Sequence, residues 1–588
     1  MNIVLCTTPI RPVPTSFPPV GTTSLLERLH QAGYSPYFFD IDGLRPDFET
    51  VVEFFRKQQP DILGISAVVS TAYRYVRDLT HAVRRVSPNT QIVLGGNLAA
   101  SAEILLKKCP IDLCVVSEGE RVIVNLVRHF ERFGDFRPTK ELNQILGISY
   151  LDRSGSLVFT GYEAPIPNEE LPEPNYDLLE KFSDINRFIT NPFDIPHFAR
   201  DPRAYEPHRA TQKTATVLTS KGCVARCTFC HRWDKGYRAV PVEKILSTIH
   251  HLKNRFNVGF FQIGDENFGS DKRQVDELVE ALKPLDILFH VAGVRVFTVE
   301  KNPKIVGQLK AAGCTAMYFG MESGSPKMLE VMEKRATLEQ NLSVIRKLNE
   351  EKMYTIVQLV LGMPGENRKT IQQTTEFVKL ATEGMDELPN ERISANLFQA
   401  LPGTPGYEYM RRWGMVGTTL DSEEAYLLKI SDVDAASSKH YQNCSEETTE
   451  RAMLWQHQII RDAIIHYYKR RGWTRLVESE AVLRGKIKDY ARGGYFRIAK
   501  FKLFRFPFFW RFENLFRAPL YWVRLFNARV RLYGPLRALG LQIGLLQEEN
   551  RSLYTIAEPE SLREIVQFPA PETLTLTEAA MLPLRAGR

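Results

Sequence analysis

Three of the chain's eight cysteines lie within one short stretch, KGCVARCTFCH, which begins at Lys221. They follow the spacing C-x3-C-x2-C at Cys223, Cys227 and Cys230. Cysteine thiolates hold iron–sulfur clusters, and a 4Fe-4S cluster ordinarily uses four of them. A cluster on three cysteines therefore keeps one iron open to another ligand. Zinc is the competing metal, but a structural zinc site closes its tetrahedron, and His231 follows Cys230 too directly to be a well-placed fourth ligand.

The composition is that of a folded protein with several domains. The 588 residues are 44% hydrophobic and 25% charged, and a chain of this length exceeds one ordinary core. The N-terminus lacks a basic flank followed by a long apolar region, and no run approaches the roughly 18 apolar residues of a membrane-spanning helix. We therefore expect a cytoplasmic protein, in which clustered cysteines bind metal rather than pair as disulfides.

Residues 1–138 alternate short apolar runs with amphipathic segments. This alternation predicts an α/β domain with a parallel sheet covered by helices on both faces. Ligands of such sheets bind at the carboxyl ends of the strands. There the sequence places small and polar residues that we predict to bind a large, flat ligand: Ser66, Ser70, Gly95, Gly96, Glu118 and Gly119. Ordinary turn chemistry is the alternative reading of the same residues.

The strand and helix rhythm resumes after a Pro-containing segment. Residues 139–210 read as an interdomain linker, and residues 211–425 contain about six β/α units, which predict an open or closed parallel barrel. The active site of such a barrel lies at the carboxyl ends of its strands, and the cysteines follow the first strand. Residues 426–588 are expected to be mainly helical.

A basic and aromatic run distinguishes the C-terminal region. Residues 484–537 hold fourteen Lys or Arg residues against Asp489 and Glu513, interleaved with Phe, Trp and Tyr. This pattern suits a segment at a membrane interface, which would favour a lipid-like substrate. It also suits a helical lid over the barrel. A nucleic-acid-binding segment is the less favoured interpretation.

The cysteine loop and three downstream motifs together resemble the radical SAM superfamily. GDENF, from Gly264, occupies the place of the family's GGE-like motif; FGMESG, from Phe319, resembles its F-G-x-E-S-G strand end; and QLVLGMPG, from Gln358, resembles its fifth strand. The resemblance implies a 4Fe-4S cluster on the three cysteines and S-adenosylmethionine on its open iron. The residues that it implies for S-adenosylmethionine are Phe229, Gly264, Asp265, Glu266, Arg295, Glu322, Ser323 and Gln358.

The N-terminal motifs GISAVVS, VLGGN and SEGER resemble the cobalamin-binding domain of the cobalamin-dependent radical SAM class, including its class B methyltransferases. The resemblance covers about residues 1–425 and implies a flavodoxin-like, Rossmann-type fold with cobalamin at the strand ends. One departure concerns the D-x-H-x-x-G signature, because Arg28 stands where Asp would precede His30. Cobalamin is therefore expected to lack a histidine on its lower face.

The resemblance implies reductive cleavage of S-adenosylmethionine to a 5'-deoxyadenosyl radical, with an electron donor such as flavodoxin or ferredoxin. Methylation of an unactivated carbon in a small or lipid-like metabolite is the favoured outcome. A non-methylating radical cyclase or rearrangement enzyme of the porphyrin-cyclase kind is the first alternative. The second is a non-catalytic corrinoid or cluster carrier, which would have no need of the S-adenosylmethionine motifs. The sequence assigns no residue a catalytic role.

Overall fold

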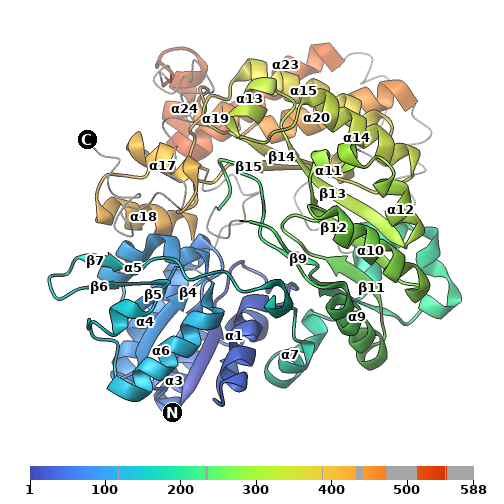
Figure 1. Cartoon of the computed structure of the whole chain (residues 1–588). Helices are drawn as coiled ribbons and strands as arrows, with labels where there is room; N and C mark the ends of the chain where they lie inside the picture. Colours follow the sequence, from blue (N-terminus) through green and yellow to red (C-terminus); the bar gives the residue numbers. More distant parts are fainter. Residues whose placement is uncertain are drawn as a thin grey trace.

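The computed structural model describes residues 1–116, 118–231, 236–386, 389–431, 441–471, 513–549 and 551. Two α/β units account for most of these residues. One contains a seven-stranded sheet and the other a six-stranded parallel sheet. Figure 1 shows the N-terminal unit in blue below the second unit, which curves over it in green and yellow. The predicted fold class, a Rossmann-type domain followed by a partial barrel and a helical C-terminal region, is confirmed.

The N-terminal sheet has the order β2-β1-β3-β4-β5-β6-β7, and its first five strands are parallel. Its strands are β1 (Ile3–Thr7), β2 (Tyr37–Phe39), β3 (Ile62–Ser66), β4 (Gln91–Gly95), β5 (Leu113–Val115), β6 (Ile148–Leu151) and β7 (Leu157–Phe159). Its helices are α1 (Val20–Gln31), α2 (Ile41–Leu44), α3 (Phe48–Gln58), α4 (Tyr73–Val86), α5 (Ala102–Lys108) and α6 (Gly119–Phe133).

Alternating side chains of the buried strands supply two separate cores. Ile3 and Leu5 of β1 pack with α1 and α6, whereas Val4 and Cys6 pack with α3, α4 and α5. Successive side chains of a strand point to opposite faces, so a strand buried on both faces reads as a continuous apolar run. The prediction of helices on both faces is therefore confirmed.

Two strands of this sheet come from the segment expected to be a linker. β6 pairs antiparallel with β5, and β7 pairs antiparallel with β6. The turn between them is held by Asp152, whose carboxylate accepts hydrogen bonds from the backbone N–H groups of Ser154 (2.8 Å) and Ser156 (2.9 Å). The sequence DRSGS is a typical turn signal. The domain boundary at residue 138 stays a prediction, but the sheet continues to Phe159.

The second sheet has its six strands in chain order, β8-β11-β12-β13-β14-β15, which is the order of an open parallel barrel. These strands are β8 (Lys213–Val217), β11 (Val258–Ile263), β12 (Leu288–Val294), β13 (Cys314–Glu322), β14 (Val357–Leu361) and β15 (Ile393–Leu397). The helices of this unit are α9 (Val242–Phe256), α10 (Lys272–Leu282), α11 (Val296–Lys301), α12 (Ile305–Ala311), α13 (Pro326–Val331), α14 (Leu338–Glu350), α15 (Arg368–Glu383) and α16 (Pro389–Arg392).

Alternation along the barrel strands separates a packed outer face from a more polar inner face. Val357, Leu359 and Leu361 of β14 are buried with residues of α14 and α15, whereas Gln358 and Val360 remain partly exposed. The remaining linker residues form α7 (Tyr176–Phe182) and α8 (Pro196–Arg200).

Helix α8 fills the part of the barrel away from the strands' carboxyl ends. Phe198 packs against Phe260 of β11, with ring centroids 5.1 Å apart, and His197 lies 2.5 Å from the hydroxyl of Tyr318. These contacts place α8 against the inner face of β11 and β13.

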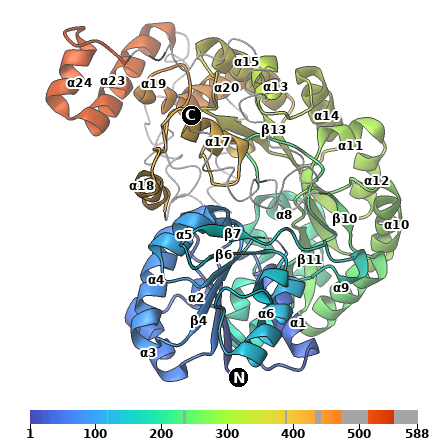
Figure 2. The same cartoon turned by 60° about the vertical axis from the view of Figure 1, so that its left-hand side comes forward.

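The C-terminal region connects the two units on a second side. Its helices are α17 (Pro405–Arg412), α18 (Leu420–Ile430), α19 (Thr449–Ala452), α20 (Trp455–Arg471), α23 (Glu513–Tyr533) and α24 (Pro535–Gln542). The hydroxyl of Tyr73 in α4 donates to Glu424 of α18 (2.9 Å), and α20 packs on α15. Figure 2 shows α23 and α24 at the periphery, away from the N-terminal sheet. No helix among the described residues has the length and apolar character needed to cross a bilayer.

Candidate active site

The cysteine loop leaves and re-enters the fold between two short paired strands. β9 (Ser220–Lys221) and β10 (Arg238–Ala239) pair antiparallel, so both ends of the loop start from one place. Within the loop, the backbone N–H of Thr228 donates to the carbonyl of Met332 (3.1 Å) and its hydroxyl donates to that of Val331 (3.0 Å). The carbonyl of Thr228 in turn accepts from the N–H of Gly406 (2.8 Å). The loop is therefore held at its base and at its centre.

The three cysteines differ in exposure: Cys227 is buried, Cys223 is half-buried and Cys230 is exposed. Burial raises the pKa of the Cys227 thiol, and the cations Lys334 and Arg295 oppose that rise. A metal that replaces the thiol proton overcomes such a raised pKa. Three soft sulfur donors on one loop, with cations nearby to offset thiolate charge, fit an iron–sulfur cluster.

Asp265 of the GDENF segment ties the end of β11 to the base of the cysteine loop. Its buried carboxylate accepts hydrogen bonds from the N–H (2.7 Å) and hydroxyl (2.5 Å) of Thr219 and from the hydroxyl of Ser220 (2.6 Å). Burial raises the pKa of Asp265, and these hydrogen bonds oppose the rise. Because the side chain of Asp265 bonds to the loop, the predicted contact of Asp265 with S-adenosylmethionine would involve its main-chain atoms.

The backbone of the GDENF segment runs directly against β12. Gly293 has φ +67°, and a Cβ there would lie 2.5 Å from the carbonyl oxygen of Asp265 and 2.6 Å from that of Glu266. Glycine is required at this approach because any side chain would displace the segment. Gly264 begins the segment, and its N–H donates to the carbonyl of Val217 (3.1 Å).

Glu322 and Lys334 form an ion pair beside Cys227. The Nζ atom of Lys334 lies 2.9 Å from a carboxylate oxygen of Glu322, and both side chains are largely buried. Burial lowers the pKa of Lys334, but the charges of Glu322 and Cys227 outweigh it, so the pKa is raised. Glu322 has φ +64°, a conformation that costs a non-glycine residue energy and is often kept at functional sites. A Cβ at Gly320 would collide with this pair.

Lys334 is a candidate that the sequence did not reveal. It is flanked by Glu333 (φ +49°) and Arg335 (φ +54°), and its carbonyl accepts a hydrogen bond from Arg295 (3.5 Å). No motif marks it, because its partner Glu322 comes from the preceding strand. Arg295 and Lys334 place two cations near Cys227, where the carboxylate of a ligand on the cluster would need them.

Ser323 and Gln358 have different surroundings. The buried hydroxyl of Ser323 lies 2.9 Å from that of Thr374 in α15 and accepts from the N–H of Ser325 (3.1 Å), so it is occupied by packing partners. Gln358 lies on the inner face, between Gly320 and Ser394 in the strand register. Phe229 is partly buried against the core that includes Phe398 and Tyr407. Their predicted contacts with S-adenosylmethionine stay predictions.

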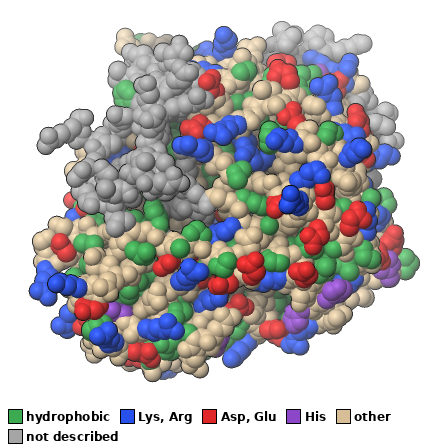
Figure 3. Space-filling view, viewed as in Figure 1, with side chains coloured by type: hydrophobic (Ala, Val, Ile, Leu, Met, Phe, Trp, Pro, Cys, Tyr) green, Lys and Arg blue, Asp and Glu red, His purple; other side chains and the backbone are tan. Residues whose placement is uncertain are grey.

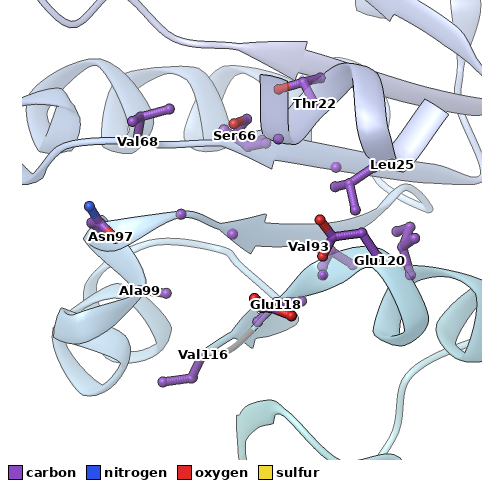
Figure 4. A pocket seen from close by; sticks show the side chains of 18 of the residues that line it. Thr22, Leu25, Ser66, Val68, Val93, Asn97, Ala99, Val116, Glu118 and Glu120 are labelled. Atoms are coloured by element: carbon purple, nitrogen blue, oxygen red, sulfur yellow. The ribbon is translucent and has the colours of Figure 1, made fainter. Parts of the chain in front are cut away.

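A cavity of about 350 Å³ lies at the carboxyl ends of β1, β3, β4 and β5 (Figure 4). Five of the six predicted cobalamin residues line it: Ser66, Gly95, Gly96, Glu118 and Gly119. Ser70 does not; it is fully buried at the start of a short 3-10 turn. Gly96 has φ +90°, and a Cβ there would collide with the carbonyl of Ala67.

The lining suits a large ligand with apolar parts. It includes the aliphatic side chains Leu5, Leu25, Val93, Val115 and Ile123 together with the glycines at the strand ends. Among the described residues that line it, none is a histidine, and the side chain of His30, at the end of α1, lies 3.2 Å from the carbonyl of Tyr34. The residues that line the cavity therefore fit cobalamin without a histidine ligand.

Glu118 joins the wall of this cavity to the base of the cysteine loop. One carboxylate oxygen lies 3.0 Å from Lys221 Nζ in β9 and also contacts Arg238 of β10. The other accepts from Arg238 (3.1 Å) and from the N–H of Ile166 (3.1 Å). Burial raises the pKa of Glu118, but these partners outweigh it and hold the pKa at about 2. Lys221 and Glu266 also line the cavity, so it adjoins the cysteine loop.

Comparison with known proteins identifies both units. Residues 217–378 match the radical SAM superfamily, and residues 8–127 match the B12 binding domain. The chain therefore combines a radical SAM domain with a B12 binding domain. The cofactors of this radical SAM enzyme are accordingly a 4Fe-4S cluster, S-adenosylmethionine and cobalamin.

Two curated relatives and one solved structure illustrate the likeness. The radical SAM enzyme is 27% identical to an uncharacterized methyltransferase of Pyrococcus horikoshii over 68% of this chain and 80% of the relative. It is also 27% identical to the anaerobic magnesium-protoporphyrin IX monomethyl ester cyclase of Cereibacter sphaeroides, over 67% of this chain but only 61% of that enzyme. The structure of OxsB, a cobalamin-dependent S-adenosylmethionine radical enzyme with aqua-cobalamin and S-adenosylmethionine bound, superposes with a TM-score of 0.58 at 17% identity. That match covers 96% of this chain and 84% of OxsB, which shows the shared fold.

Proposed function

We propose that this radical SAM enzyme is a methyltransferase acting on an unactivated carbon of a small or lipid-like metabolite. The observation that carries the proposal is the junction at Glu118, where the cavity of the B12 binding domain meets the base of the cysteine loop. A substrate held between these two places would lie within reach of both cofactors. When bound, the cofactors supply the radical and the methyl carrier, and the protein supplies their placement.

The chain's residues divide this placement among themselves. Cys223, Cys227 and Cys230 would hold the cluster, and Arg295 with Lys334 would neutralise the carboxylate of S-adenosylmethionine. Lys334 Nζ lies 2.9 Å from one carboxylate oxygen of Glu322, and this carboxylate would accept hydrogen bonds from a ribose.

Exclusion of water is the second task of the fold, because a radical intermediate must be protected from side reactions. Helix α8 fills one part of the barrel, where Phe198 is fully buried. The N-terminal sheet domain adjoins the cysteine loop through Glu118 and contacts α18 through Tyr73. The reacting groups would thus be enclosed on opposite sides by parts of the same chain.

A non-methylating cyclase is the second candidate, because the magnesium-protoporphyrin cyclase is as similar in sequence (27%) as the uncharacterized methyltransferase. The chain spans about three fifths of that cyclase, against four fifths of the methyltransferase, which favours methylation. A carrier without catalysis does not explain the buried Glu322–Lys334 pair.

Anaerobic turnover with methyl-labelled S-adenosylmethionine tests the proposal. The full chain, reconstituted with iron, sulfide and cobalamin and reduced by flavodoxin or ferredoxin, would be supplied with metabolite and lipid extracts and analysed by mass spectrometry. We expect labelled products that require cobalamin. Unlabelled products formed with consumption of S-adenosylmethionine would support the cyclase instead. Cys227→Ser is the matched inactive control.

A further inference from the structure

Helices α23 (Glu513–Tyr533) and α24 (Pro535–Gln542) form a hairpin on the outside of the C-terminal region. The turn between them is at Gly534, which has φ +80°. Figure 2 shows the hairpin projecting from the body of the molecule. Residues 484–512, the first part of the basic run, lie outside the described residues. The described part packs on α19 and within the hairpin, so it does not show the expected lid.

One side of the hairpin is firmly docked. Arg529 is buried and lies 3.3 Å from Glu450 of α19, contacts Glu548, and donates to the side chain of Gln542 (2.9 Å). The hydroxyl of Tyr533 donates to the other carboxylate oxygen of Glu450 (3.1 Å). These contacts fix the hairpin to the protein, so the side that faces outward is set by the fold.

The outward side carries a cluster of aliphatic residues that we call the hairpin tip: Leu536, Leu539, Ile543, Leu545 and Leu546. Leu536 is 86% exposed and Leu545 is 78% exposed. Leu536, Leu539 and Ile543 recur at helical spacing, whereas Ala538 and Leu541 on the opposite side are buried against the protein. Helix α24 is thus apolar on both sides, a pattern of helices that are buried or in contact with lipid.

Cations adjoin the hairpin tip. Arg531 and Arg537 are both exposed, and the guanidinium of Arg537 lies 5.4 Å from the ring centroid of Tyr533. Residues 513–549, which include the hairpin and its tip, have five arginines against the three glutamates Glu513, Glu548 and Glu549. The face in Figure 3 intermixes acidic, basic and apolar side chains. The hairpin therefore complements a surface that is both apolar and negatively charged.

We propose that the hairpin tip docks on an anionic phospholipid surface. Exposed leucines beside arginines are typical of helices that lie in the membrane interface, with the apolar side among the acyl chains and the cations at the headgroups. A protein partner fits less well, because leucine is under-represented among the residues that dominate protein interfaces. A small ligand would need a concave site, and the tip projects outward. The inference does not depend on which reaction the enzyme catalyses.

Vesicle flotation with the full, cofactor-loaded chain tests this surface. We expect the protein to float with vesicles of phosphatidylcholine and phosphatidylglycerol, and at least tenfold less with phosphatidylcholine alone. The double variant Leu536→Glu/Leu545→Glu should lower partitioning to anionic vesicles at least tenfold, because it places charge where the acyl chains would lie. Arg531→Gln/Arg537→Gln should lower it several-fold and reduce its sensitivity to salt.

Leu380→Glu provides the matched control, since Leu380 is a 53% exposed leucine on α15, outside the hairpin. It should float as the wild type does, and far-ultraviolet circular dichroism should show that every variant is folded. Binding to anionic vesicles that survives the double leucine substitution would overturn the proposal. So would a wild-type chain that fails to float, or one whose self-association in sedimentation is abolished by the same substitution without any vesicle binding.

Discussion

Replacement of Glu118 by Gln removes the charge that joins the cavity of the B12 binding domain to both strands at the base of the cysteine loop. The carboxylate is held at a pKa of about 2, against a reference value of 4.5. A shift of that size corresponds to about 3 kcal/mol of stabilising free energy. The side chains of Arg238 and Lys221 are 15% and 23% exposed, so solvent screens their charges in part. We therefore expect Glu118→Gln to lower the free energy of unfolding by about 2–3 kcal/mol.

The pH dependence follows from the direction of this shift. Because the folded state holds the pKa of Glu118 below its unfolded value, the stabilisation is complete above about pH 4.5. It is lost as the pH falls toward about 2. The difference in the free energy of unfolding between wild type and Glu118→Gln should therefore be constant near neutrality. It should narrow by about 1.4 kcal/mol for each pH unit below 4.5.

Urea unfolding of the cluster-free chain, followed by tryptophan fluorescence between pH 7 and pH 3.5, measures both effects. Glu277→Gln is the matched control, because Glu277 is an exposed carboxylate on α10. We expect Glu118→Gln to unfold at a lower urea concentration than the control at pH 7. Equal midpoints at pH 7, or a gap that stays constant down to pH 3.5, would refute the role assigned to Glu118.

Three further substitutions test the site. Lys334→Met leaves Glu322 buried without its cation, so the dissociation constant of S-adenosylmethionine in equilibrium dialysis should rise at least tenfold while the cluster's electron paramagnetic resonance signal persists. Gly96→Ala would collide with the carbonyl of Ala67, so cobalamin should no longer co-elute in gel filtration although the cluster still assembles. Asp265→Ala removes the acceptor of three hydrogen bonds from Thr219 and Ser220 at the base of the cysteine loop, so the iron bound per chain after reconstitution should fall by more than half. Unchanged iron content would contradict the positioning role of Asp265.

The sequence predicted what depends on local pattern and spacing. Apolar alternation predicted the parallel strands of both sheets but not β6 and β7, which lie in the segment expected to be a linker. The cysteine spacing located the loop between β9 and β10. The strand-end rule placed five of the six predicted cobalamin residues at the cavity of the N-terminal sheet, whereas Ser70 does not line it. Such features need only short-range chain geometry and the rule that ligands meet parallel sheets at their carboxyl ends.

Side-chain partners that are distant in sequence could not be predicted in this way. The carboxylate of Asp265 accepts hydrogen bonds from Thr219 and Ser220. The hydroxyl of Ser323 is hydrogen-bonded to that of Thr374, which is 51 residues away in the sequence. Lys334 carries no motif, and its importance depends on the ion pair with Glu322. In each case the fold, rather than the local sequence, decides which polar group a side chain meets.

The ratio of two products tests whether the enzyme transfers a methyl group with cobalamin. Methyl transfer in this family's pairing of cofactors should convert one S-adenosylmethionine to S-adenosylhomocysteine for each one cleaved to 5'-deoxyadenosine. Quantitative chromatography of anaerobic turnovers with accepted substrate should therefore find the two products in nearly equal amounts, with both reduced when cobalamin is omitted. Formation of 5'-deoxyadenosine alone, at an unchanged rate without cobalamin, would contradict cobalamin-dependent methyl transfer.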